Sequence, residues 1–231
     1  MTHRSYARAL LGILLVPMLA FRLGGWAVIT VDDLPEYVVA GKPFALSFMV
    51  RQHGSSPLNL LKPTIVVRSG DSSFSVPALW ANERGRYSAM VTAPRAGEWT
   101  VTIHSGFMNS ENTLLPLRAI VAGAAVPRVL AGAERGRRLF VAKGCVSCHM
   151  RGTETAANGM AIGPDLTGRH YEADLVAKFL ADPDASPLSR GASPAGIRMP
   201  TLDLKEREIA ALVTYLNSER PVLGSTAPRG E

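Results

Sequence analysis

The chain has 231 residues, of which 47% are hydrophobic and 19% charged, so it can build one large or two small packed domains. A mean hydropathy of +0.11 excludes a protein with many membrane spans, because each span needs about 20 consecutive apolar residues. Two cysteines exclude a disulfide-rich scaffold, while the net charge of +6 raises the question of a nucleic-acid partner.

Residues 1–25 have the pattern of an export signal. Arg4 and Arg8 precede an uncharged apolar run, residues 9–21, which as a helix would rise about 20 Å against a hydrocarbon core of roughly 30 Å. The small-residue cleavage signal at 25–27 is weak, so a retained anchor with Arg22 at the membrane surface is the alternative to a cleaved signal peptide. A buried helix of a cytosolic domain is the third interpretation.

Residues 26–123 have a period of two, which is typical of strands with one buried face. Three apolar runs alternate in this way: Phe44, Leu46, Phe48 and Val50; Tyr87, Ala89 and Val91; and Trp99, Val101 and Ile103. Turn sequences separate the runs, and seven or so short strands in this length predict an antiparallel β-sandwich. Through Gly85-x-Tyr87 followed by residues 96–99, the region resembles small exported immunoglobulin-like or cupredoxin-like domains, including the YtkA-like kind.

Copper-compatible side chains occur in this β region: Met49, His53, His104 and Met108. A blue-copper site needs a cysteine thiolate and a binuclear copper centre needs two cysteines, and the region contains none. These two centres are therefore excluded. A weaker His/Met copper site stays open, and a structural or docking role is the expected one.

Both cysteines stand in one motif, Cys145-Val146-Ser147-Cys148-His149. Two thiols three residues apart can form thioethers with the two vinyl groups of one haem, and the next residue then presents an imidazole to the iron. A disulfide or a thioredoxin-like redox pair does not account for the adjacent histidine. The motif therefore predicts one haem c, covalently bound through Cys145 and Cys148, with His149 as an iron ligand.

Residues 131–220 resemble a class I cytochrome c, whose elements occur here in the order of that family. Gly136 and Phe140 lie one helical turn apart on residues 133–143, as in the amino-terminal helix of the family. An intervening helix is predicted over 172–181 from four apolar side chains, Leu175, Val176, Phe179 and Leu180. The resemblance implies an all-α fold around the haem.

The same resemblance implies the surroundings of the iron. In the family, a proline carbonyl accepts the ring N–H of the proximal histidine, and Pro164 in Gly163-Pro164-Asp165-Leu166 matches that position. Met199, followed by a proline and a predicted helix, matches the axial methionine. Met150 is too close to His149 to reach the opposite face, and Met160 precedes the Pro164 loop, so both are poorer candidates.

The last predicted helix follows Met199. Asp203 and Glu206 have the spacing of a capping box, with Asp203 as the N-cap and Glu206 at the third helical position. An apolar stripe with helical spacing follows: Ile209, Leu212, Val213 and Leu216. Tyr215 resembles the aromatic residue that packs near Gly136 where the two terminal helices of the family cross.

Iron ligated by His149 and Met199 has no open position for oxygen, peroxide or nitrite, which favours electron transfer, and no residue is predicted to be catalytic. We expect an exported protein in the periplasm, or on the outer face of the cytoplasmic membrane of a bacterium. A haem sensor or peroxidase-like enzyme, and a copper-handling protein that uses the sandwich, are the alternatives.

Redox proteins are the expected partners, above all a respiratory or photosynthetic membrane complex for which the sandwich serves as a docking module. The domain order resembles oxidase subunit II proteins with a fused cytochrome, although the copper cysteines and a transmembrane hairpin are missing. Membrane contact is expected only through the N-terminal segment.

The expected chain is multidomain: a signal peptide or anchor at 1–25, an all-β sandwich at 26–123, a linker at 124–130, an all-α class I cytochrome c fold at 131–220 and a flexible tail at 221–231. Residues 1–25 carry +3 of the net charge, whereas residues 26–130 have nine basic and seven acidic residues and residues 131–220 have twelve and eleven. The remaining positive charge is spread over two domains, so nucleic acid is excluded as a partner. A positive surface would instead steer a protein partner.

Overall fold

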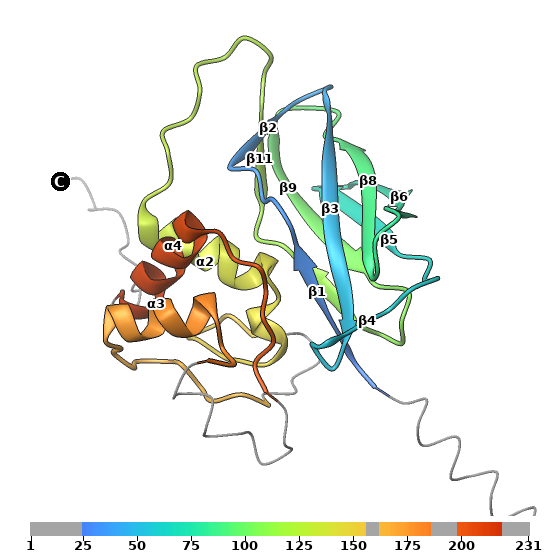
Figure 1. Ribbon diagram of the computed structural model, residues 1–231. Helices are drawn as coiled ribbons and strands as arrows, with labels where there is room; N and C mark the ends of the chain where they lie inside the picture. Colours follow the sequence, from blue (N-terminus) through green and yellow to red (C-terminus); the bar gives the residue numbers. More distant parts are fainter. Residues whose placement is uncertain (1–24, 156–161, 186–197, 219–231) are drawn as a thin grey trace, which may run out of the picture.

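A computed structural model describes residues 25–155, 162–185 and 198–218. Two β-sheets come first and a helical region follows, which confirms the predicted all-β then all-α arrangement (Figure 1). The predicted export segment up to residue 24 and the predicted tail lie outside these residues. In the described part, no helix combines the length and the apolar character that a membrane crossing requires.

The first sheet has five strands in the order β1-β3-β8-β7, with β4 paired to β3. These strands are β1 (Ala27–Val31), β3 (Pro43–Gln52), β4 (Ser56–Pro57), β7 (Leu79–Trp80) and β8 (Arg86–Thr92). The second sheet has six strands in the order β2-β11-β9-β5-β6, with β10 paired to β9. These are β2 (Tyr37–Val39), β5 (Thr64–Ser69), β6 (Ser72–Pro77), β9 (Gly97–His104), β10 (Glu111–Thr113) and β11 (Leu117–Ile120). The strands outnumber the prediction because several short pairs have no clear alternation.

The core of the sandwich is built from the three alternating runs on β3, β8 and β9. Their largest fully buried side chains are Phe48, Tyr87 and Trp99, whereas Phe44 at the start of its run is only partly buried. The polar tip of Tyr87 has a partner, since its Oη donates to Leu58 O at 2.9 Å. The period of two therefore identified the buried face of all three strands.

The helical region consists of α2 (Gly132–Ala142), the 3₁₀ turn η1 (Cys145–Ser147), α3 (Ala173–Ala181) and α4 (Glu206–Asn217). Helices α2 and α4 cross at Gly136, where a Cβ atom would lie 2.0 Å from Ala211 O and 2.5 Å from Tyr215 Cβ. Only glycine permits this approach of the two backbones. The ring of Phe140 packs 5.7 Å from that of Tyr215, so the predicted crossing is confirmed.

The predicted cap of α4 is wrong by two residues. The N-cap is Lys205, and Glu208 Oε2 accepts from Lys205 N at 3.0 Å, so the third helical position belongs to Glu208 rather than Glu206. Asp203 has a left-handed backbone with φ of +51° and pairs with Arg51, which removes it from the helix end. Contacts with the sandwich therefore set where α4 begins.

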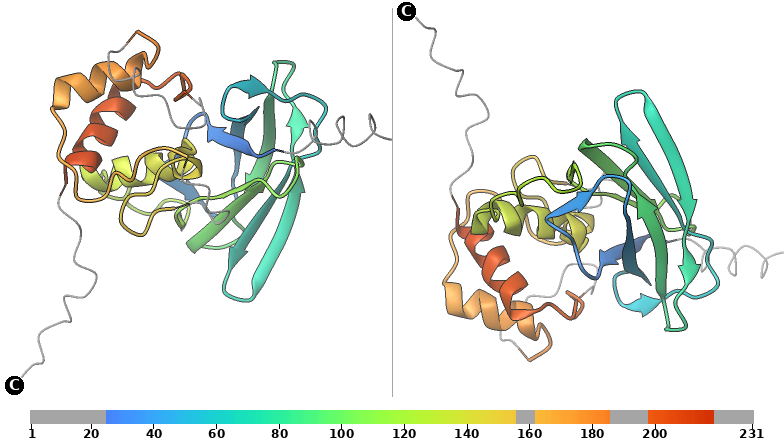
Figure 2. Two further views of the ribbon diagram at one scale, coloured as in Figure 1. Left: turned by 90° about the horizontal axis from the view of Figure 1, so that it is seen from below. Right: turned by 90° about the horizontal axis from the view of Figure 1, so that it is seen from above.

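The helical region lies beside β1, at one edge of the five-stranded sheet (Figures 1 and 2). Gly144, with φ of +79°, follows α2 so closely against β1 that a Cβ atom there would lie 2.6 Å from Val28 Cγ1 and 2.7 Å from Ile29 O. Asn112 Nδ2 donates both to Ile29 O at 3.2 Å and to Val141 O at 3.0 Å. The end of α2 is thus bonded to the edge of the sandwich.

A buried ion pair completes this junction. Lys143 Nζ lies 3.0 Å from Glu208 Oε1 and donates to Asp32 O at 2.7 Å, and the side chains of Lys143 and Glu208 are each only 3% exposed. Thr30 Oγ1 donates to Lys143 O at 3.3 Å. One lysine therefore connects the sandwich to both α2 and α4.

Candidate haem site

The predicted ligands converge on one cavity of about 740 Å³. Its wall contains all five predicted site residues: Cys145, Cys148, His149, Pro164 and Met199. Apolar side chains of α3 and α4 form much of the remaining wall: Leu175, Val176, Phe179, Leu180, Leu212 and Leu216. Cofactor cavities range over ~300–1,000 Å³ and are mostly apolar with a few placed polar groups, so this one has the size and the character of a cofactor site.

The cysteines are presented by the η1 turn. Backbone N–H groups of Cys148 and His149 donate to Cys145 O at 3.1 and 2.8 Å, which brings the two cysteines and the histidine onto one turn. The thiols are not joined by a disulfide. Burial, with the neighbouring Cys148, raises the pKa of Cys145 to about 12, and burial raises that of Cys148 to about 11. Burial therefore favours the neutral thiol form of both groups in the haem-free chain.

His149 is oriented by the loop that carries Pro164. The ring atom Nδ1 lies 3.0 Å from Pro164 O, which is the contact that the family resemblance implied. A Cβ atom on Gly163 would lie 2.3 Å from His149 Cε1, so glycine is required for this close approach. Burial lowers the pKa of His149, and the bond to Pro164 opposes that shift. The neutral ring that donates from Nδ1 leaves Nε2 unprotonated and available to a metal.

Met199 is half-buried and lines the same cavity, where it also packs against the helical core. Met150 is not in the cavity wall, and its carbonyl accepts from Leu166 N at 2.8 Å. Met160 lies outside the described residues. The structure thus brings one of the two described candidate methionines to the cavity.

Other wall residues were not predicted to belong to the site, four of them from the sandwich and from the segment before α3. Val28 and His53 come from the sandwich, and Arg169 and Tyr171 come from the segment before α3. The hydroxyl of Tyr171 is buried and has no hydrogen-bond partner in the described part of the chain. The only sequence signal for Tyr171 was that an aromatic residue stands directly before the predicted helix 172–181. No sequence pattern indicated that Val28 or His53 would line this cavity.

The residues present fit a haem. Two thiols, an imidazole and a thioether supply attachment and axial ligation, and the apolar walls suit a macrocycle. The exposed Arg169, which also lines the cavity, can bind a carboxylate at its rim.

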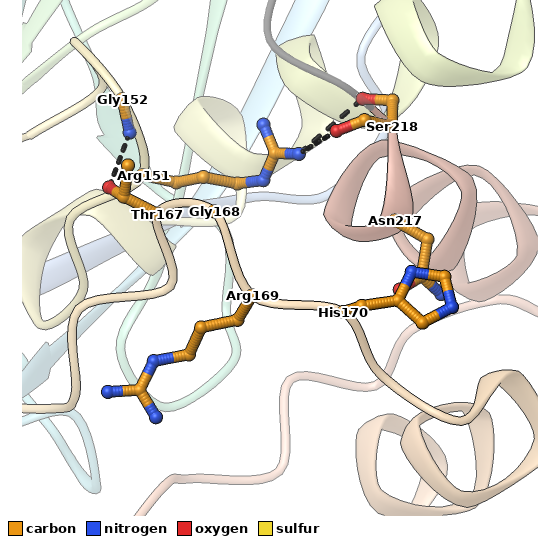
Figure 3. Close-up of a pocket in the computed structure, with 8 residues that line it drawn as sticks. All are labelled: Arg151, Gly152, Thr167, Gly168, Arg169, His170, Asn217 and Ser218. Carbon is orange, nitrogen blue, oxygen red and sulfur yellow. Dashed lines mark hydrogen bonds between the residues drawn. The ribbon is translucent and has the colours of Figure 1, made fainter.

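A second cavity of about 470 Å³ is lined by Arg151 and Gly152, by residues 167–170 and by the end of α4 (Figure 3). Arg151 Nη2 donates to Ser218 O at 2.7 Å and to Leu216 O at 3.3 Å, and its guanidinium lies 4.1 Å from the centre of the Tyr215 ring. These bonds cap the C-terminal end of α4. Arg151 therefore joins the segment after the haem motif to the last helix.

The copper-compatible residues are divided between the two sheets. Met49 and His53 belong to β3 and the turn after it, whereas His104 ends β9 and Met108 follows it. Nδ1 of His104 lies 3.1 Å from Glu111 Oε2, and Met108 is 62% exposed. Within residues 25–155, 162–185 and 198–218, no group of three or more His, Cys, Asp or Glu side chains could hold a metal ion.

Comparison with known families identifies the helical region. Residues 133–219 match the family model of cytochrome c. This cytochrome c domain supports a haem-binding, electron-transfer role and implies covalently bound haem c. A search of curated proteins gave no match.

Two solved structures are similar over part of the chain. A candidate glycoside hydrolase from Bacteroides vulgatus is 20% identical to this chain, with a TM-score of 0.30. The match covers 38% of this chain and 17% of the hydrolase. The PKD domain of the human VPS10 domain-containing receptor SorCS2 is 15% identical with a TM-score of 0.24, over 43% of this chain and 76% of that domain. Similarity this low carries no argument, and the YtkA-like or cupredoxin-like type of the sandwich stays a prediction.

Proposed function

We propose that this chain is an exported c-type cytochrome that transfers single electrons through one haem c. The haem is attached to Cys145 and Cys148 and ligated by His149 and Met199. One observation carries the proposal: attachment groups, an oriented imidazole and a thioether all line a single cavity with apolar walls.

The chain itself tunes the site. A bound haem supplies a one-electron couple. Pro164 O holds the proton on Nδ1 of His149 and so directs Nε2 toward the cavity. The thioether of Met199 favours the reduced state and raises the reduction potential. Apolar side chains of α3 and α4 exclude water, which keeps the local dielectric low and raises the potential further.

We assign no catalytic residue to the chain. When His149 and Met199 both ligate the iron, no position is left for a substrate. This distinguishes an electron carrier from the haem sensor or peroxidase-like enzyme considered above.

Haem counting and potentiometry test this function together. We expect one covalently bound haem per purified chain, and a reversible titration with the slope of a one-electron couple at positive potential. A chain loaded by its maturation system that holds no covalent haem, or whose haem does not change oxidation state reversibly, would contradict the proposal.

For location and partners, we propose the outer face of the cytoplasmic membrane or the periplasm, and electron exchange with a membrane complex. The apolar run at 9–21 after Arg4 and Arg8 supports export. Cell fractionation after mild solubilisation should recover the cytochrome with a membrane oxidoreductase. Recovery of the protein only as a free carrier would contradict the proposed membrane complex. Recovery in the cytoplasm would contradict the proposed export.

A further inference from the structure

The residues from Met199 to Lys205, here called the methionine segment, contact the sandwich at three positions: Pro200, Asp203 and Lys205. They connect the predicted axial ligand to α4, which begins at Glu206. The sandwich side of the contact is β1, β3 and the turns that follow these two strands. A cytochrome that consists of one domain has no neighbouring sandwich to hold this segment. The contacts therefore call for an explanation that the cytochrome fold alone does not provide.

The first contact is next to Met199. Pro200 lies against the turn after β3, where a Cβ atom placed on Gly54 would be 3.4 Å from Pro200 Cγ and 3.6 Å from Val28 Cγ2. Pro200, Val28 and the adjacent His53 line the haem cavity. The sandwich therefore forms a part of the cavity wall beside the residue that follows the axial methionine.

The second contact is electrostatic. Arg51 Nη2 lies 3.8 Å from Asp203 Oδ2, and Arg51 Nη1 donates to Thr30 Oγ1 at 3.2 Å. The Arg51 side chain is only 9% exposed, so its guanidinium has a fixed position on the sheet. Asp203, the partner of this guanidinium, has a left-handed backbone conformation. This conformation is strained for a residue other than glycine and persists when the surrounding structure compensates the strain.

The third contact is at the end of the segment. Lys205 Nζ pairs with Asp33 in the turn after β1. One helical turn further on, Glu208 makes the buried pair with Lys143, which precedes Gly144 and Cys145. The chain after Met199 and the chain before Cys145 are thus fixed to the same strand edge.

We infer that the β-sandwich positions the sixth ligand of the haem. Arg51 and Asp33 act as positioning residues: they hold the methionine segment so that Met199 stays in the cavity wall and resists replacement by another ligand. This inference rests on the proposed function, because it requires a haem whose iron Met199 ligates.

Imidazole competition on the oxidised holoprotein measures this role. Asp33→Asn/Asp203→Asn removes both negative charges and keeps side-chain size, and asparagine tolerates the left-handed backbone at position 203. Because each exposed pair contributes little, we expect the affinity for imidazole to rise about fivefold, and the reduction potential to fall.

Asp71→Asn/Glu98→Gln is the matched control. It makes the same change of net charge on the six-stranded side of the sandwich, at the turn before β6 and on β9. An effect of net charge alone would appear in both double variants. A local effect of charge near the haem differs in sign, because removing negative charge raises the reduction potential whereas loss of positioning lowers it and raises the imidazole affinity.

A double-mutant cycle between the two regions provides the second test. Arg51→Met keeps the apolar stem of the side chain but loses the charge, and we combine it with Asp203→Asn. If Arg51 acts through Asp203, the effects of the two substitutions on imidazole affinity are not additive. A residue that only stabilises the sandwich would shift thermal unfolding without this coupling.

The outcomes separate the two proposals. Wild-type protein without covalent haem, or without the sulfur-to-iron absorption band, overturns the proposed function. Wild-type protein with both features, but with equal imidazole affinities in the Asp33/Asp203 and Asp71/Glu98 variants and additive effects in the cycle, overturns the positioning role alone.

Discussion

The two halves of the molecule have cores of different kinds. Among the described residues, the sandwich core holds 22 buried apolar residues, of which one, Ala142, belongs to α2, whereas the helical core holds 11 and borders a cavity of about 740 Å³. The helices have 11, 9 and 12 residues, and isolated helices below about 12–15 residues are marginal in water. We therefore expect the sandwich to be stable on its side chains alone, and the helical region to need the haem and the sandwich for its stability.

The largest expected effect comes from removing the attachment groups. Cys145→Ser/Cys148→Ser should abolish covalent haem and leave the cavity without its cofactor, so the helical circular-dichroism signal falls while the strand signal remains. All three tryptophans lie between residues 26 and 99, so their fluorescence should still report a cooperative transition of the sandwich.

Ser147→Ala, which keeps both thiols in the same turn, is the control for that variant and should retain haem and helix. A haem-free double variant with full helical signal would show that the helical core is stable without the cofactor, which would contradict this expectation.

The next effect tests whether the halves unfold together. Lys143→Met leaves the buried Glu208 without its cation, which costs about 3–5 kcal/mol of unfolding free energy. We expect urea unfolding followed by haem absorption and by tryptophan fluorescence to shift equally, because Lys143 bonds both regions. Adding Glu208→Gln removes the unpaired charge and should recover most of the loss. Separate shifts of the two probes would show two independent units.

A smaller effect is expected at the helix crossing. Gly136→Ala forces a Cβ atom into Ala211 O and Tyr215, and such overpacking costs about 1–3 kcal/mol. The loss should be seen by haem absorption during urea unfolding. Gly132→Ala in the same helix meets only the exposed Thr214 at 3.3 Å and should be close to neutral. Equal effects at both glycines would mean that the crossing is not tight.

The smallest effect is pH-dependent. The hydrogen bond and charge of Lys205 hold the pKa of Asp33 below its ordinary value of 3.8. The pair therefore stabilises the fold above that pH, and its contribution disappears as the pH falls through the lowered pKa. Asp33 is largely exposed, so Asp33→Asn should lower the unfolding free energy by about 0.3 kcal/mol at pH 7 and have no effect near pH 3. An effect that grows in acid would contradict the pairing.

Local patterns predicted much of this molecule because local physics decides them. The period of two gave the buried faces of β3, β8 and β9, and the helical stripes gave the apolar faces of α3 and α4 that line the cavity. Gly136 and Tyr215 were identified as a crossing because a missing side chain is itself a sequence signal. The haem motif needs only one turn of chain.

Docking of the two regions was not predictable in this way. The placement of Val28 and His53 in the cavity wall, and of Arg51 against Asp203, depends on contacts between residues far apart in sequence. The predicted cap at Asp203 was wrong because its spacing matched a local rule that Lys205 and Glu208 satisfy instead, two residues later.

Ligation of one haem by His149 and Met199 is tested most directly by the absorption spectrum of the oxidised holoprotein. We predict a sulfur-to-iron charge-transfer band that survives in Met150→Ala and disappears in Met199→Ala, with a lower reduction potential in the latter. A band that survives Met199→Ala, or a wild-type spectrum without the band, would contradict ligation of the haem by Met199.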